Sequence, residues 1–348
     1  MTLGFRVIES RSMVSKRNPI FDICKFFAML LVVYWHCMSY RDGFKLSETP
    51  SYSANFIIAV NMPLFFMISG YFSRNLHESG DWSRLLRRLV SYFWPLAFFS
   101  TVYAGLETAF LDMYCIAGFP LLAIKRFLFC GWFFYALAIC DVATYLIYRC
   151  GPWRKRQILI AAAFFLLFCV LSNHIWHVSN VVAMIPFYWF GLVIFPRLID
   201  RELALMCVGG AGFFAMVYVT FFAGNIATNG LSFYWDQFDI CSLRVNMILN
   251  MVLRYIVGIL GSVFIIASVH LLCLSAKCIT KISFLGTETL GIFFVHDELV
   301  AVVNRELEVI IGDCLSMLVL ASCVYVFSYL VVWGSKRLRC IRYIVWGN

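Results

Sequence analysis

Three side chains that are charged or titrate near neutral pH lie within one apolar segment, FDICKFFAMLLVVYWHCMSY, at residues 21–40. They are Asp22, Lys25 and His36: an acid, a cation and an imidazole. On an α-helix, Lys25 and His36 would project only about 20° apart and be separated by roughly 16 Å along the axis. Asp22 would lie one turn before Lys25, near the same face. Side chains of these types transfer protons and bind anions, so this face is the first candidate for chemistry.

Structural alternatives stay open for these three side chains. Asp22 and Lys25 lie near one end of the segment and can pair with each other or extend to the lipid headgroups. His36 can be a hydrogen-bonded structural histidine. A charge at the centre of a lone membrane helix costs about 2.5–3.5 kcal/mol, so such residues usually face the bundle interior or a watery cavity. We therefore expect the three to face a shared cavity.

The composition places the helix that carries them in a lipid bilayer. Hydrophobic residues make up 62% of the 348 residues, charged residues make up 14%, and the mean hydropathy is +0.85. These values exclude a soluble globular domain and predict an all-α, polytopic membrane protein forming a single integral-membrane domain over residues 1–348. About ten transmembrane helices are expected from the apolar runs at 21–40, 54–73, 90–111, 127–148, 157–172, 181–196, 203–223, 248–273, 283–303 and 314–333.

The basic residues alternate in density between these runs, which predicts the orientation of the chain. They are dense before the first run, between the second and third, and after the last. By the positive-inside rule both termini are cytoplasmic, with residues 1–20 as an N-terminal segment and 335–348 as a tail. The net charge of +9 then reflects topology and anionic lipid, so we expect membrane lipids as partners and no nucleic acid. The fourteen cysteines show no CxxC or Cys/His metal spacing, and no metal is predicted.

The first apolar segment also carries a motif. DICKFFAMLLVVYWH (22–36) resembles the signature of the type-3 membrane acyltransferase family, in which a basic residue and a histidine are separated by ten positions. The family often has arginine where this chain has Lys25, which is a point charge without the bidentate fork of arginine. Further similar segments follow in family order: NMPLFFMISGYF (61–72), RLLRRLVSYFWP (84–95), GWFFYAL (131–137), IPFYWFG (185–191) and SFLGTETLGIFFVH (283–296).

The resemblance implies an integral-membrane O-acyltransferase. Such an enzyme moves an acyl group, commonly acetyl, from acyl-CoA to a hydroxyl of a surface glycan or another envelope molecule. The expected donor is therefore acyl-CoA, with acetyl-CoA as the form the family favours, and the expected location is the bacterial cytoplasmic membrane.

The resemblance also suggests roles for the three side chains. A neutral histidine, with an ordinary pKa near 6.5, suits the abstraction of a hydroxyl proton at neutral pH, so His36 is the candidate general base. Lys25 is expected to attract the donor phosphates or polarise the thioester carbonyl. Asp22 is expected to hold Lys25 or to orient an imidazole.

Other polar residues are assigned from their place in these motifs. The cations of the third segment are expected to steer the donor phosphates, with a headgroup anchor as the alternative. The predicted donor-binding residues are Lys25, Arg84, Arg87 and Arg88, and the predicted cavity residues are Asn61, Ser69, Trp132 and His296. Glu107 and Asp141 lie within apolar runs and cannot face lipid cheaply, but their roles, like the chemical role of His296, stay open.

Two other classes of function compete with the enzyme. A transporter or flippase of a polar lipid-linked molecule would use Asp22, Lys25, Glu107, Asp141 and His296 as a charge pathway, but no internal repeat of the kind common in transporters is visible. A membrane sensor or scaffold leaves the alignment of Lys25 and His36 unexplained. The acyltransferase is therefore the favoured interpretation.

Overall fold

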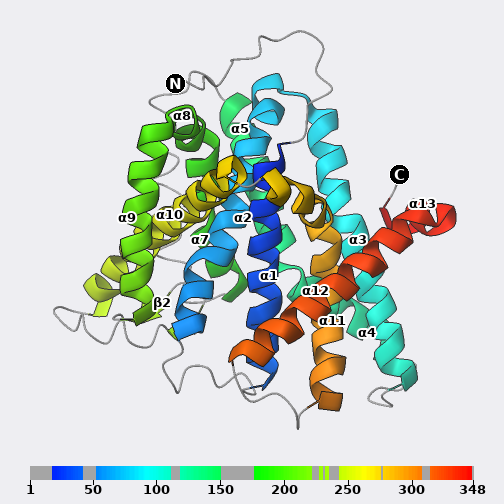
Figure 1. Cartoon of the computed structure of the whole chain (residues 1–348). Coiled ribbons are helices and arrows are strands. Elements are labelled where there is room, and N and C mark those ends of the chain that lie inside the picture. Colours follow the sequence, from blue (N-terminus) through cyan, green and yellow to red (C-terminus); the bar gives the residue numbers. More distant parts are fainter. Residues whose placement is uncertain are drawn as a thin grey trace.

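The computed structural model describes residues 18–41, 52–110, 118–149, 176–221, 227–229, 232–234, 243–275, 277–307 and 314–346. These residues are almost entirely helical (Figure 1). The helices are α1 (Pro19–Arg41), α2 (Tyr52–Ser79), α3 (Trp82–Phe110), α4 (Phe119–Cys130), α5 (Trp132–Arg149), α7 (Trp176–Trp189), the π-helix η2 (Phe190–Ile194), α8 (Phe195–Ile199), α9 (Glu202–Phe221), α10 (Leu243–Ser275), the 3-10 helix η3 (Lys277–Thr287), α11 (Thr289–Leu307), α12 (Cys314–Arg337) and α13 (Arg339–Trp346). Strands β1 (Ala227–Asn229) and β2 (Ser232–Tyr234) form one short antiparallel hairpin.

The structure supports a multi-pass membrane protein with fewer clear spans than the sequence predicts. Among the described residues, six helices are long and apolar enough to cross a bilayer: α1, α2, α3, α9, α10 and α12. Helices α4 and α5, which meet at a 53° bend, would make a seventh if they count as one span. The predicted run at 157–172 lies outside the described residues. The ten crossings and the cytoplasmic termini stay predictions.

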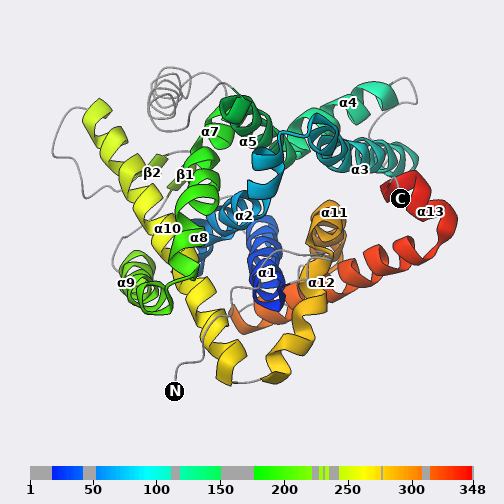
Figure 2. The same ribbon diagram turned by 90° about the horizontal axis from the view of Figure 1, so that it is seen from above.

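Helix α1 lies at the centre of the bundle. Figure 2 shows it surrounded by α2, α10, α11 and α12. Several of its apolar side chains, such as Cys24, Met29 and Val33, are fully buried, which is consistent with the apolar sequence between its polar residues. A central helix contacts protein on most sides, so polar groups on it can face other side chains instead of lipid.

Local sequence explains how the neighbouring helices begin and cross. Asp81 caps α3, because its Oδ1 accepts hydrogen bonds from the backbone N–H groups of Ser83 (2.9 Å) and Arg84 (3.4 Å). Helices α2 and α7 approach so closely at Gly70 that a Cβ there would lie 1.9 Å from the carbonyl oxygen of Tyr188. Small residues allow such close packing in membranes, and here they bring Tyr188 to the side of α2.

The bundle has two ends that differ in which part of α1 they contain. Helices α1, α3 and α11 begin at one end and finish at the other (Figure 1). We call these the Lys25 end and the His36 end. The polar side chains inside the bundle gather near these two ends.

Candidate functional site

At the Lys25 end, the acid and the cation of α1 form an ion pair. Lys25 Nζ lies 2.8 Å from Asp22 Oδ1, and the side chains are 24% and 4% exposed. Lys25 Nζ also lies 5.3 Å from the centre of the Phe72 ring, on α2. Helix η3 crosses α1 at this level, where a Cβ on Gly286 would lie 1.6 Å from the carbonyl oxygen of Asp22. The segments 22–36, 61–72 and 283–296 therefore meet around this pair.

At the His36 end, the imidazole of α1 contacts an acid from α11. His36 Nδ1 lies 3.0 Å from Asp297 Oδ1, and the side chains are 30% and 39% exposed. The hydroxyl of Tyr40 also hydrogen-bonds to Asp297. When the Nδ1–H of a neutral imidazole donates to a carboxylate, the ring is oriented and Nε2 is left to accept a proton. The arrangement is a partly exposed imidazole oriented by a carboxylate.

His296 lies against the ring of His36. The two ring centroids are 4.9 Å apart in an edge-to-face arrangement. His296 is buried, and its Nδ1 is 3.1 Å from the Ile292 carbonyl oxygen, so Nδ1 carries the hydrogen. Its Nε2 is also buried and has no hydrogen-bond partner within the described part of the chain. The structure thus places the predicted cavity residue His296 beside the predicted base.

Aromatic packing fixes the helix that carries both of these α11 residues. The Phe294 ring stacks on Phe134 of α5, with centroids 4.6 Å apart, and on Phe99 of α3, with centroids 5.2 Å apart. Phe293 stacks on Phe133 at 5.0 Å. These contacts fix the orientation of α11 about its own axis, so that His296 and Asp297 face α1.

A second ionic group lies next to Asp297. Arg126 Nε donates to Glu107 Oε2 at 3.0 Å, and its terminal nitrogens contact Glu107 and Glu298. The three side chains are partly exposed and come from α3, α4 and α11. Because Glu298 follows Asp297 in the sequence, this bridge ties the position of Asp297 to α3 and α4. Glu107, whose role the sequence left open, is one arm of this bridge.

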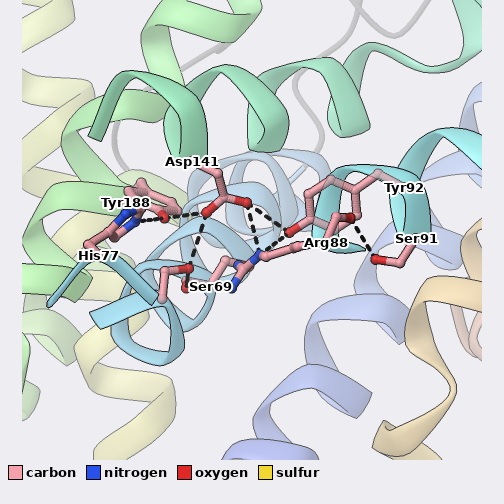
Figure 3. Close-up of polar contacts among 8 residues, drawn as sticks. Ser69, His77, Arg88, Ser91, Tyr92, Asp141 and Tyr188 are labelled. Atoms are coloured by element: carbon pink, nitrogen blue, oxygen red, sulfur yellow. Dashed lines mark hydrogen bonds and ion pairs between the residues drawn. The ribbon is translucent and has the colours of Figure 1, made fainter. Parts of the chain in front are cut away.

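Asp141 is the centre of a cluster of polar contacts, drawn in Figure 3, which lies near the Lys25 end. The carboxylate has no exposed surface. It accepts hydrogen bonds from the hydroxyls of Ser73 (3.3 Å), Tyr92 (3.1 Å) and Tyr188 (2.5 Å), and Arg88 Nε lies 2.9 Å from it. The cluster joins α2, α3, α5 and α7. A buried carboxylate with this many donors is stabilised without solvent, so Asp141 is a structural centre of the bundle.

The three predicted donor-binding arginines have different surroundings. Arg88 is held by Asp141 and Tyr92. Arg84 pairs with Asp81 at 3.2 Å on the surface, and Arg87 is exposed. All three lie in the first two turns of α3, at the same end of the bundle as Lys25 (Figure 1).

The remaining predicted cavity residues, Trp132, Asn61 and Ser69, have different surroundings. Trp132 contacts Phe133, which reaches His296 through Phe293. Asn61 is buried in α2, and its side-chain oxygen accepts from the N–H of Met62 at 2.6 Å. The backbone carbonyl of Ser69 accepts a hydrogen bond from the Ser73 hydroxyl at 2.7 Å, beside the Asp141 cluster.

Asp297 is the functional candidate that sequence reasoning did not assign. It lies in the polar sequence His296, Asp297, Glu298, which interrupts an apolar run. That interruption is the sequence signal, because three polar residues in a row on a membrane helix need partners. The identity of the partner depends on how α1 and α11 pack.

The described helices thus form a multi-pass membrane bundle with a histidine held by a carboxylate at one end and cations at the other. The chain belongs to the type-3 acyltransferase family, whose acyltransferase domain matches residues 18–336. It is therefore a membrane acyltransferase. Comparison with curated proteins and comparison with solved structures each found no match.

Proposed function

We propose that this acyltransferase is an O-acyltransferase of the bacterial cytoplasmic membrane, which moves an acyl group, in the first instance acetyl, from acyl-CoA to a hydroxyl of a surface glycan or another envelope molecule. The observation that carries the proposal is the contact between His36 Nδ1 and Asp297. It gives the bundle a partly exposed, oriented imidazole, which is the group that activation of an alcohol requires. The family assignment favours this chemistry over transport.

In the proposed reaction His36 acts on the acceptor. Nε2 takes the proton of the acceptor hydroxyl while that oxygen attacks the carbonyl carbon of the thioester. The tetrahedral intermediate then expels the coenzyme A thiolate, which receives the proton from the imidazolium. Asp297 stabilises the imidazolium through Nδ1–H and keeps the ring in the productive orientation. The step is direct transfer, and one ester forms as one thioester breaks.

The donor is proposed to lie along α1. Coenzyme A carries its phosphates and its thioester at opposite ends of a long flexible arm, and Lys25 and His36 lie roughly 16 Å apart along one helix. Lys25 and the cations Arg84, Arg87 and Arg88 are proposed to bind the phosphates, with Asp22 holding Lys25 in place. The cations at the Lys25 end and the imidazole at the His36 end are consistent with a donor whose phosphates lie at Lys25 and whose thioester lies at His36.

The acceptor is proposed to approach the His36 end. His296 and Trp132 are the proposed lining residues at this end, and Asn61 and Ser69, further along α2, are proposed to line the reaction chamber toward the Lys25 end. His296 supports this most directly, because its buried Nε2 is a hydrogen-bond acceptor beside His36. A hydroxyl or amide N–H of a substrate would satisfy that acceptor.

The test uses purified full-length protein, radiolabelled acetyl-CoA and extracted envelope glycan. Label is expected to enter the glycan with the natural chain and not with a correctly inserted His36→Ala variant. Asp297→Asn is expected to retain the fold and to lower transfer. Uptake of unmodified substrate into vesicles without label transfer would instead support the transporter.

A further inference from the structure

Arg88 has an unusual position among the predicted donor-binding cations. Its side chain is 24% exposed, whereas the carboxylate that it contacts has no exposed surface. Its Nε donates to the hydroxyl of Tyr92 at 2.6 Å and lies 2.9 Å from Asp141 Oδ2. One nitrogen of the guanidinium, Nε, is therefore anchored in the protein interior, while the side chain as a whole keeps some exposed surface.

Tyr92 is the residue that completes this anchor. It is one helical turn after Arg88 on α3, is buried, and donates its hydroxyl hydrogen to Asp141 at 3.1 Å while accepting from Arg88. Arg88, Tyr92 and Asp141 thus form a closed triangle of contacts (Figure 3). A guanidinium held through Nε keeps a fixed plane, and its two terminal nitrogens form the fork that binds phosphate in two places.

Arg88 and Lys25 both lie at the Lys25 end of the bundle. Lys25 Nζ contacts the ring of Phe72, and Ser73, the next residue of α2, donates to Asp141. Adjacent residues of α2 thus connect the two cations.

We propose that Tyr92, together with Asp141, is a positioning residue for the donor: it fixes the plane of the Arg88 guanidinium so that the terminal nitrogens face the phosphates of coenzyme A. The inference rests on the proposed function, because it takes acyl-CoA as the donor. Holding a side chain in its binding geometry before the ligand arrives lowers the entropy lost on binding. The anchor therefore increases donor affinity without touching the donor.

Tyr92→Phe is the discriminating variant because it removes the hydroxyl and changes no charge. Replacing Asp141 would alter the charge next to Arg88 as well as its orientation. Tyr92→Phe is expected to weaken the binding of tritiated coenzyme A about 3- to 10-fold, measured on the full chain in lipid nanodiscs. In transfer assays the donor KM is expected to rise by the same factor with kcat unchanged.

A double-mutant cycle tests whether Tyr92 acts through Arg88. Arg88→Lys keeps the positive charge but has no Nε for Tyr92 to hold. The double variant Tyr92→Phe/Arg88→Lys is expected to bind coenzyme A no more weakly than Arg88→Lys alone. If the double variant instead weakens coenzyme A binding by the product of the two single factors, the proposal is overturned. An Arg88→Lys variant that binds coenzyme A like the natural chain would also overturn it. The second outcome decides the matter even if Tyr92→Phe fails to fold.

Tyr145→Phe is the matched control. Tyr145 is also buried near the Lys25 end, and its hydroxyl donates to the Gly80 carbonyl oxygen at 2.8 Å. Its loss is expected to leave coenzyme A affinity unchanged. Equal weakening in this variant would show general loosening of the bundle and overturn the proposal.

The outcomes separate this inference from the proposed function. Coenzyme A binding that Tyr92→Phe weakens, in a protein that transfers no acyl group, would refute the transfer and support the anchor. Intact transfer with equal donor affinity in Tyr92→Phe would refute the anchor alone. A natural chain that does not bind coenzyme A at all would refute both.

Discussion

The Asp141 cluster and the His36 cluster use the same kinds of side chains in opposite ways. Asp141 is wholly buried and accepts from three hydroxyls besides its contact with Arg88. Asp297 is 39% exposed, and its contacts are the imidazole of His36 and the hydroxyl of Tyr40. The first carboxylate has used its hydrogen-bonding capacity on the fold. The second keeps His36 oriented and partly accessible, which a reaction requires.

The comparison shows that an ionisable residue inside a membrane protein is not by itself a sign of catalysis. The sequence singles out Asp141 and His36 for the same reason, the cost of a polar group in an apolar run. Burial and the number of partners separate them. A buried carboxylate whose oxygens all accept hydrogen bonds, like that of Asp141, favours a rigid structure. A partly exposed imidazole whose Nε2 is left to accept a proton, like that of His36, favours proton transfer.

The sharpest test of the comparison is the replacement of the base. His36→Ala is expected to lower acyl transfer about 10²–10⁴-fold, because proton abstraction from the acceptor is lost. Its unfolding temperature is expected to change little, since His36 is partly exposed. Transfer of labelled acetyl from acetyl-CoA and thermal unfolding of the same sample measure both quantities. Activity close to that of the natural chain would end the role given to His36.

At the Asp141 cluster we expect a large effect on stability. Asp141→Ala leaves Arg88 without its buried counter-charge and is expected to destabilise the protein by about 3–5 kcal/mol. Thermal or denaturant unfolding in detergent micelles measures the change. A variant of unchanged stability would show that the cluster does not hold the four helices together.

A smaller effect is expected at the bridge that supports Asp297. Arg126→Lys keeps the charge but cannot contact Glu107 and Glu298 through a planar fork. Loss of one charge-assisted hydrogen bond is expected to cost about 1.5–3 kcal/mol of stability. The rate of acyl transfer should also fall, because Asp297 would hold His36 less firmly. An unchanged transfer rate with lowered stability would limit the bridge to a structural role.

The smallest effect is expected at a surface ion pair of the same chemical type. Arg74 and Glu78 are one turn apart on α2, with Nε and Oε1 at 2.7 Å, and both are about half exposed. Arg74→Ala is expected to change stability by about 0.5 kcal/mol or less and transfer not at all. A loss as large as that of Arg126→Lys would mean that burial does not govern these pairs.

The sequence predicted the helices better than it predicted the crossings. Nine of the ten apolar runs coincide with described helices, because hydropathy and length are local properties. The run at 181–196 became α7, η2 and α8, and the run at 127–148 was divided by the bend between α4 and α5. Such breaks depend on neighbouring helices, which hydropathy does not register.

The sequence by itself determined that this chain is a membrane acyltransferase with a cation and a histidine on its first helix. Those conclusions depend on composition, on spacing along one helix and on an ordered set of motifs, none of which requires knowledge of how the helices pack. Only the tertiary structure decided that His36 meets Asp297, which is 261 positions away, and that Arg88 is anchored by Tyr92 and Asp141. Several acids in apolar runs look alike in the sequence. The rotation and packing of the helices decide which of them contacts a given cation or imidazole, and these are properties of the folded bundle only.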